Sequence, residues 1–380
     1  MKKTVRFGVI GCGLMGREFA GAAARWSQLS EDIPRPEIVG VADPVPGARE
    51  WFTGNFPGVR ISTADYRELL SDPGIDAIYA AVPHALHEKV YIDVIEAGKH
   101  LLGEKPFGID KAANDRILMA LARHPEVTVR CSSEFPYYPG CQELIRRIRE
   151  HECGKIIEVR SSFCHSSDMD PEKPINWKRK VELNGEYGCM GDLGIHVEHV
   201  PFRMGWIPEN VFAKLSNIVT ERPDGKGGRA PCLTWDNALL ISDVRDADGG
   251  TFPLLMRTMR LAPGATNSWS LEVLGMRSSA RFTTDDPNAF FYTDSWGREQ
   301  AWCRIGVGYK PMIPTVTGGI FEFGFPDAIL QMWAAFMTEL GGGTPSFGVL
   351  RPEETRLSHR LQTAALVSQR EGRVVRLSEI

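Results

Sequence analysis

The chain has 380 residues, of which 43% are hydrophobic and 24% are charged, the composition of an ordinary globular protein. This length favours two domains, each large enough to bury a core without disulfide or metal staples. A net charge of −4 without a long block of one sign argues against a nucleic-acid partner or a membrane partner.

The first 130 residues alternate between short apolar runs, typical of buried strands, and helical segments. Repeated units of this kind predict a parallel sheet with helices on both faces. Strands are expected at 4–11, 37–43, 76–82, 100–106 and 127–134, and helices at 15–26, 64–72, 85–98 and 111–124.

After about residue 150 strand-like runs follow one another, separated by turn clusters such as RPDGKGGR. The sequence therefore predicts an α/β protein, with an N-terminal domain of residues 1–130 and a C-terminal α+β domain of residues 131–380. The second domain is expected to contain a large, open, mainly antiparallel sheet. Its strands are expected at 155–164, 210–219, 237–244, 252–261, 269–275, 279–284 and 374–377, and its helices at 328–343 and 352–372.

Eight cysteines are scattered along the chain, and none forms a C-x-x-C pair. Their spacing resembles neither a zinc site nor a disulfide framework, so we expect buried free thiols in a reducing compartment and no metal. Glycines interrupt the apolar N-terminal run, and no segment approaches the ~18 apolar residues of a membrane span. We therefore expect a cytoplasmic protein.

A glycine-rich loop follows the first predicted strand and opens the first predicted helix. Gly11, Gly13 and Gly16 have the G-x-G-x-x-G spacing, which lets a backbone turn tightly and approach a pyrophosphate at a helix N-terminus. Leu14 and Met15 lie inside the loop and are expected to contact the same cofactor. The loop alone is a weak signal, but the strand before it and the helix after it strengthen the prediction of a Rossmann domain.

Asp43 ends the second predicted strand, where an acid accepts hydrogen bonds from the ribose hydroxyls and repels a 2′-phosphate. No arginine or lysine follows it immediately. The sequence therefore predicts NAD as the cofactor, with NADP less favoured.

Two further segments carry residues suited to proton transfer. Glu104 and Lys105 end the fourth predicted strand, where ligands of such folds bind, and a lysine there can bond a substrate hydroxyl. In GDLGIHVEH, Asp192 and His196 are four residues apart and share one helix face, with His199 close to that face. Each of these residues has an ordinary alternative, as a solvated lysine or a histidine satisfied by local hydrogen bonds.

Taken in this order, the motifs GVIGCGLMG, AVPHALH, EKP and GDLGIH make the chain resemble the Gfo/Idh/MocA family of oxidoreductases over nearly its whole length. The resemblance implies oxidation or reduction of a sugar, cyclitol or related polyol with a nicotinamide cofactor. It also implies a C-terminal open sheet that serves in oligomer contacts, so we expect a homodimer or homotetramer.

The resemblance also implies roles for single residues. Lys105 matches the lysine that contacts the substrate hydroxyl, and Asp192 and His196 match the acid and the histidine beside the substrate carbinol. These three are the expected catalytic residues. The cofactor contacts implied by the loop after the third predicted strand are Pro83, His84 and His87.

The chain departs from the family pattern at two places. His199 stands where the family commonly has an aspartate, and SSEFPYYPG replaces the usual Asn-x-Arg segment, which puts Glu134 there. Glu134 either bonds sugar hydroxyls or caps the following helix. Trp177 and Lys178 precede the acid–histidine segment, and an aromatic ring with hydrogen-bonding neighbours suits a sugar ring. We therefore include Glu134, Trp177, Lys178 and His199 among the expected substrate contacts.

Three functions compete on these observations. The first is an NAD-dependent dehydrogenase that transfers a hydride between a carbinol carbon and the nicotinamide. The second is a redox-neutral glycoside hydrolase or lyase that oxidises its sugar only transiently. The third is a non-catalytic NAD-binding sensor, against which the combined presence of Lys105, Asp192 and His196 argues.

Overall fold

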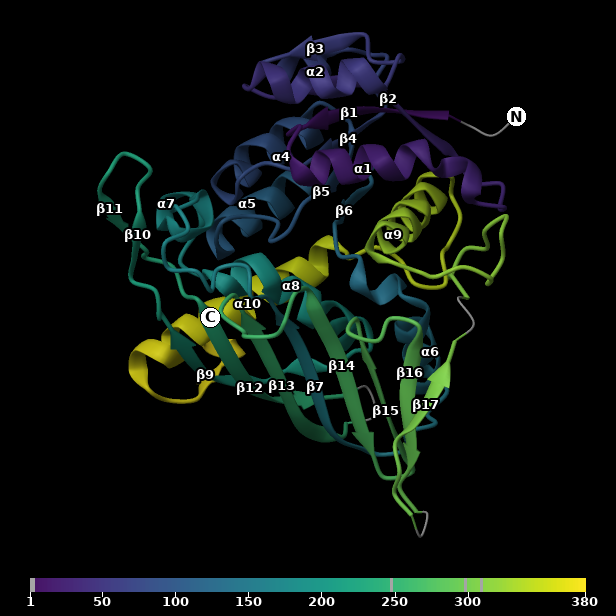
Figure 1. Ribbon diagram of the computed structural model, residues 1–380, viewed down its shortest axis with the longest axis vertical. Helices are drawn as coiled ribbons and strands as arrows, with labels where there is room; N and C mark the ends of the chain where they lie inside the picture. Colours follow the sequence, from purple (N-terminus) through teal and green to yellow (C-terminus); the bar gives the residue numbers. More distant parts are fainter. Residues whose placement is uncertain (1–3, 247–248, 297–298, 308–309) are drawn as a thin grey trace. The chain divides into compact units, whose positions relative to one another are not determined.

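The computed structural model describes residues 4–246, 249–296, 299–307 and 310–380. The chain divides into two compact units, each described here by itself. The described residues of Met1–Tyr137 and Tyr309–Pro352 form unit 1, and those of Tyr138–Gly308 and Glu353–Ile380 form unit 2. In Figure 1 the first segment of unit 1 is coloured purple to blue and its second segment yellow-green.

Unit 1 is built on a six-stranded parallel sheet with the strand order β3-β2-β1-β4-β5-β6. Its strands are apolar and buried along most of their length, as expected where helices cover both faces. The strands are β1 (Thr4–Ile10), β2 (Arg35–Ala42), β3 (Ile61–Thr63), β4 (Ala77–Ala80), β5 (His100–Gly103) and β6 (Val129–Cys131). The helices are α1 (Leu14–Ala24), α2 (Pro46–Asn55), α3 (Arg67–Ser71), α4 (His87–Glu96), α5 (Lys111–Leu121) and α9 (Phe325–Leu340), with short 3-10 turns η1 (Trp26–Gln28), η2 (His84–Leu86) and η3 (Phe135–Tyr137).

Helix α9 joins unit 1 although it lies far along the chain. It packs against α1, where the rings of Phe19 and Trp333 approach to 3.9 Å between centroids (Figure 1). The sequence alone predicts a single boundary near residue 130, with this segment in the second domain. Burial of the apolar face of α9 against α1 explains the difference, because hydrophobic packing does not depend on sequence separation.

Unit 2 contains a large sheet with the order β17-β16-β15-β14-β7-β13-β12-β9-β18, in which β8 also pairs with β12. All its pairings are antiparallel except that of β7 with β13. The strands are β7 (Ile156–Cys164), β8 (Ile207–Pro208), β9 (Asn210–Ser216), β12 (Asn237–Arg245), β13 (Thr251–Met259), β14 (Ser268–Gly275), β15 (Ser278–Thr283), β16 (Ala289–Asp294), β17 (Cys303–Gly306) and β18 (Val375–Arg376), with a separate hairpin of β10 (Glu221–Pro223) and β11 (Arg229–Pro231). The helices are α6 (Pro139–Arg149), α7 (Val181–Asn184), α8 (Cys189–Arg203) and α10 (Pro352–Glu371), with η4 (Trp177–Arg179) and η5 (Leu377–Glu379).

The predicted fold class, a Rossmann domain followed by an α+β domain with a large antiparallel sheet, is confirmed. Strand β3 and helix α2 are not predicted from the sequence. Strand β3 is only three residues long, and α2 begins with Pro46 and Gly47, so neither shows a clear apolar period.

All eight cysteines are free thiols, and only Cys303 is exposed, against the expectation that all are buried.

Candidate active site

The three glycines of the loop after β1 meet different surroundings. A Cβ on Gly11, whose φ is +95°, would lie 2.2 Å from the Ala81 carbonyl oxygen, and one on Gly16 would lie 2.2 Å from the Gly11 carbonyl oxygen. Both positions therefore need glycine for the turn and for its contact with the start of α1. A Cβ on Gly13 would meet no atom within 4 Å, so the fold itself leaves room at this position. Open space beside a backbone at a helix N-terminus fits the pyrophosphate of a dinucleotide.

The first residues of α1 lie beside that open space. Leu14 is 77% exposed, which is unusual for a large apolar side chain, and Met15 is half-buried. Neither is required for the core of unit 1. Their predicted contact with the cofactor stays a prediction.

The Asp43 carboxylate, which follows β2, is held by two backbone N–H groups. Cys12 donates to one oxygen at 2.8 Å and Val45 donates to the other at 2.8 Å, so the carboxylate joins the glycine loop to its own loop. Arg49 donates to the Asp43 carbonyl oxygen, and Arg17 lies over the Trp51 ring. Neither arginine is predicted from the sequence, because they come from α1 and α2 and do not follow Asp43 directly.

The loop after β4 is fixed by a histidine. The His87 ring is fully buried; its Nε2 lies 3.0 Å from the Val82 carbonyl oxygen, and its Nδ1 accepts from the Gly108 N–H at 3.3 Å. The ring therefore connects the loop after β4 to the loop after β5. Pro83 precedes the short turn η2, and His84 is buried.

Two buried carboxyl groups lie near Lys105 in unit 1. Glu104, at the end of β5, accepts a hydrogen bond from the Tyr79 hydroxyl at 2.8 Å, and Glu134 follows β6. Their exposed fractions are only 6% and 5%. Burial, followed by the charge of Glu104, raises the pKa of Glu134 to about 8, while Lys105 acts in the opposite direction. Glu134 is therefore a protonated carboxyl at neutral pH, able to donate a hydrogen bond.

In unit 2, Asp192 lies in the first turn of α8 and is 1% exposed. Its two oxygens accept from Lys178 Nζ at 3.1 and 3.2 Å, and it forms a second ion pair with Arg260. Lys178 Nζ also lies 5.7 Å from the centroid of the Trp177 ring, to which it is joined in η4. The structure thus brings together Trp177, Lys178 and Asp192, three of the expected substrate contacts, and adds Arg260, which no motif indicated.

His196 lies one turn further along α8. Its ring is 3% exposed and meets the Phe163 ring edge-on at 5.3 Å, while its carbonyl oxygen accepts from Trp269 Nε1 at 2.9 Å. Phe163 and Trp269 belong to β7 and β14, so the sheet fixes the place of His196 on the helix.

His199 is fully buried near the end of α8. Its Nε2 lies 3.4 Å from Arg203 Nη2, and Arg203 forms a two-pronged ion pair with Glu354 at 2.5 and 2.7 Å. Burial, with the charges of Arg203 and His196, holds the pKa of His199 well below its ordinary value. The ring is therefore neutral at neutral pH, and its expected contact with the substrate stays a prediction.

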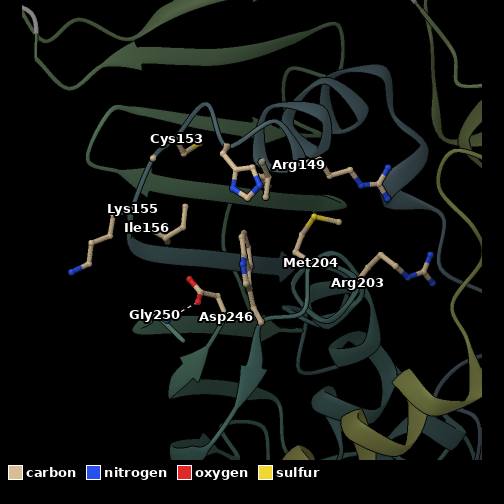
Figure 2. Close-up of a pocket in the computed structure, with 12 residues that line it drawn as sticks. Arg149, Cys153, Lys155, Ile156, Arg203, Met204, Asp246 and Gly250 are labelled. Carbon is tan, nitrogen blue, oxygen red and sulfur yellow. Dashed lines mark hydrogen bonds between the residues drawn. The ribbon is translucent and has the colours of Figure 1, made fainter. Parts of the chain in front are cut away.

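A cavity of about 530 Å³ in unit 2 contains none of the expected site residues. It lies between the end of α6, the start of β7 and the end of α8. Figure 2 shows the Arg149 and Arg203 guanidinium groups on one side of it, whereas Lys155 extends away on the other. Arg203 is already paired with Glu354, so this cavity does not share the chemistry described above.

No group of three or more histidine, cysteine, aspartate or glutamate side chains in residues 4–246, 249–296, 299–307 and 310–380 could hold a metal ion. In the same part of the chain, no helix is both long and apolar enough to cross a membrane.

Comparison with known proteins identifies relatives over much of the chain. Residues 5–132 match the Gfo/Idh/MocA family, described as an oxidoreductase family with an NAD-binding Rossmann fold. Levoglucosan dehydrogenase of Pseudarthrobacter phenanthrenivorans is 25% identical over 70% of this chain and 67% of its own length. Glucose-6-phosphate 3-dehydrogenase of Bacillus subtilis is 24% identical over 76% and 77%. The scyllo-inositol 2-dehydrogenase (NAD(+)) of the same organism is 31% identical, over 41% and 44%. Two other relatives are matched over only 57% and 54% of their lengths.

Solved structures share the whole fold. Levoglucosan dehydrogenase in complex with NADH and levoglucosan superposes with a TM-score of 0.86 over 99% of this chain and 100% of that chain. The sequence identity is 21%, so this similarity shows a shared fold and nothing further.

Proposed function

Because the chain belongs to the Gfo/Idh/MocA family of NAD-binding oxidoreductases, we propose that it transfers a hydride between NAD and a carbinol carbon of a sugar, cyclitol or related polyol. The expected family and its class of cofactor are confirmed, and so is the expectation of an oxidoreductase. The substrate, the preference for NAD over NADP and the roles of single residues are part of the proposal. None of the relatives named above supports the alternative of a redox-neutral hydrolase or lyase.

The observation that carries the proposal is the distribution of polar groups along one edge of the unit 1 sheet. The glycine loop follows β1, and Asp43, Pro83, Lys105 and Glu134 follow β2, β4, β5 and β6 in turn. Ligands of open parallel sheets bind at the carboxyl ends of the strands. These positions support a dinucleotide site at this edge, where hydride transfer takes place in such folds, with Lys105 close enough to the buried Glu134 to act on its carboxyl group.

We assign the proton chemistry to the chain's own residues. When bound, NAD accepts the hydride from the substrate carbon. Lys105 donates a hydrogen bond to the reacting oxygen, and the His196 imidazole, whose ordinary pKa is near 6.5, takes the hydroxyl proton. Asp192 holds Lys178 in place for contact with the remaining hydroxyls.

The substrate class rests on the polar groups and on the relatives. In unit 2, Trp177 offers an aromatic face and Lys178 beside it offers a hydrogen-bond donor, a pair that suits a polyhydroxylated ring. In unit 1, the protonated Glu134 offers a further hydrogen-bond donor. The relatives include enzymes named for levoglucosan, scyllo-inositol and glucose 6-phosphate. We therefore propose that the substrate is a cyclic polyol whose ring resembles that of one of these three compounds.

The assignment is tested by Lys105→Ala and His196→Ala, with the surface variants Lys111→Ala and His124→Ala as matched controls. We expect each site variant to lose ~100- to 10,000-fold in turnover, the usual contribution of a positioned acid–base group. NAD affinity, measured by quenching of protein fluorescence, should change little. Near-normal turnover in either site variant would show that the residue does not act on the proton.

We also propose that copies of the chain pair through the exposed face of the unit 2 sheet. Phe212, Ile241 and Leu255 stand side by side across β9, β12 and β13 in the strand register. Phe212 is 41% exposed and Ile241 is 42% exposed, and Leu239 adds a further exposed apolar side chain to the same strand face. An apolar face of this kind on a sheet is typical of an interface between subunits.

A further inference from the structure

Arg260 lies where the chain leaves β13, the strand on which α8 packs. Its backbone N–H donates to the Asp236 carbonyl oxygen at 3.0 Å and to the Asn237 side-chain oxygen at 3.2 Å. These bonds fix the Arg260 backbone at the end of the sheet. The place from which its side chain extends is therefore set by the sheet itself.

The Arg260 guanidinium joins two buried carboxylates. It forms an ion pair with Asp192 of α8 and lies 3.7 Å from an oxygen of Asp168. Arg260 is 7% exposed, and Asp192 and Asp168 are 1% and 2% exposed. Asp168 is itself held by Arg179, and by Lys173 Nζ at 3.1 Å.

The buried charges of this network balance. Arg179 bridges Asp168 to Asp236, and Arg222 donates to the carbonyl oxygens of Asp168 and Asp170 at 2.5 and 2.6 Å. Burial opposes the charge on Asp168, yet Arg179 and then Arg260 lower its pKa to about 2. Burial lowers the pKa of Arg260 to about 10, which leaves it a cation at neutral pH. The buried members are Asp168, Asp192, Asp236, Arg179, Arg222 and Arg260.

We propose that Arg260 is a positioning residue of the active site, which holds the Asp192 carboxylate ionised and fixed against Lys178. A carboxylate paired with two cations accepts hydrogen bonds and does not take up the substrate proton, which leaves that proton to His196 and Lys105. This inference rests on the proposed function. In unit 2, Lys178 from η4 and Arg260 from the end of β13 pair with Asp192, and Asp168 from the segment after β7 faces Arg260. The titratable neighbours of Asp192 on α8 itself are Cys189, which also lies near Arg260, and His196.

The test compares Arg260→Met with Arg260→Lys, and uses Arg257→Met, an exposed arginine of the same strand, as the matched control. His196 sets the acidic limb of kcat/KM for sugar oxidation, so we expect the low-pH end of this limb to steepen from a slope of about one to about two in Arg260→Met, because loss of the nearby opposite charge raises the pKa of Asp192 by ~1 to 3 units. Arg260→Lys keeps the charge and should restore the slope to about one. Arg257→Met should leave the limb unchanged.

An unchanged acidic limb in a folded Arg260→Met protein would overturn the inference, and so would a failure of Arg260→Lys to restore it. A second measurement decides the question if Arg260→Met does not fold or if no sugar is oxidised. The carboxyl of Asp192 is titrated by NMR in protein labelled at aspartate, with Asp192→Asn to identify the signal. A pKa below the ordinary ~3.9 supports the inference, and a pKa at or above it refutes it. Absence of sugar oxidation by the unaltered protein refutes the proposed function alone.

Discussion

The Asp43 carboxylate has a structural role and a proposed role in cofactor binding. It accepts the Cys12 and Val45 N–H groups, and we propose that it also accepts the ribose hydroxyls of NAD. The expected preference for NAD rests on this second role, because a carboxylate repels a 2′-phosphate. The guanidinium of Arg49 is held at the carbonyl of the same residue, so a cation lies close to the acid.

Asp43→Ala should therefore weaken NAD binding and reduce the difference in affinity between NAD and NADP, since Arg49 then remains to attract the 2′-phosphate of NADP. The measurement is the dissociation constant of each dinucleotide by titration calorimetry. Asp65→Ala, which removes another turn-forming acid of unit 1, is the control and should leave both constants unchanged. Tighter binding of NADP than of NAD by the unaltered protein would contradict the assignment.

Glu134 makes the stability of the protein depend on pH. Its folded-state pKa is raised from 4.5 to about 8, so between these values the folded protein holds a proton that the unfolded chain releases. The free energy of unfolding therefore falls as the pH rises through this window, by at most ~1.4 kcal/mol per pH unit. The side chain introduced in Glu134→Gln cannot ionise. The free energy of unfolding of this variant should therefore rise relative to that of the unaltered protein as the pH rises from 4.5 to 8. Urea unfolding at several pH values, with the exposed Glu150→Gln as control, measures this difference, and parallel curves would refute it.

For single residues, the sequence predicts site residues that lie in a recognisable segment, but not the residues from elsewhere in the chain that contact them. Lys178 and Asp192 were both expected near the substrate, and they form an ion pair. Arg260 could not be predicted, because it follows an ordinary strand and reaches Asp192 only where α8 packs on β13. The raised pKa of Glu134 likewise depends on burial beside Glu104, which no local pattern reveals.

The glycine loop and the start of α1 form the element on which cofactor binding depends. Gly11 and Gly16 are needed by the fold, whereas Gly13 has an ordinary φ of −76° and free space around a Cβ. The chain itself therefore leaves the space at Gly13 open. We propose that it is kept for the pyrophosphate.

Gly13→Ala should leave the thermal midpoint nearly unchanged and yet weaken NAD binding at least ~10-fold, because the added methyl group enters the space of the phosphates. Gly21→Ala on α1 also meets no atom within 4 Å and is the matched control, with NAD binding unaffected. Scanning calorimetry gives the stability and fluorescence quenching gives the affinity. Full NAD affinity in Gly13→Ala would place the cofactor elsewhere.

Elements with a clear apolar period were predicted from the sequence, including α8 and α9. The assignment of α9 to a unit was not, because amphipathic character shows that a helix has a buried face and not which partner covers it. Short elements such as β3 depend on pairing with β2 and carry little signal of their own.

On the scale of the whole molecule, the open sheet of unit 2 bears on assembly. Replacing Phe212 and Ile241 together by lysine puts two charges on the apolar strip shared by β9 and β12. If copies pair there, the double variant should shift towards monomer in sedimentation velocity while its thermal unfolding stays cooperative. Lys214→Glu on the same face is the control for charge alone. An unchanged sedimentation coefficient in the folded double variant would show that this face is not the interface.

The central claim is that the chain catalyses net oxidation or reduction of a cyclic polyol with NAD. It is tested most directly by incubating the unaltered protein with NAD and a panel of sugars, anhydrosugars and cyclitols, following the absorbance of the reduced nicotinamide and analysing the products in parallel. The account predicts reduced nicotinamide in equal amount to a ketone product for at least one compound, with loss of both in Lys105→Ala. Conversion of a sugar without any net change in the nicotinamide would contradict it and would point to redox-neutral cleavage instead.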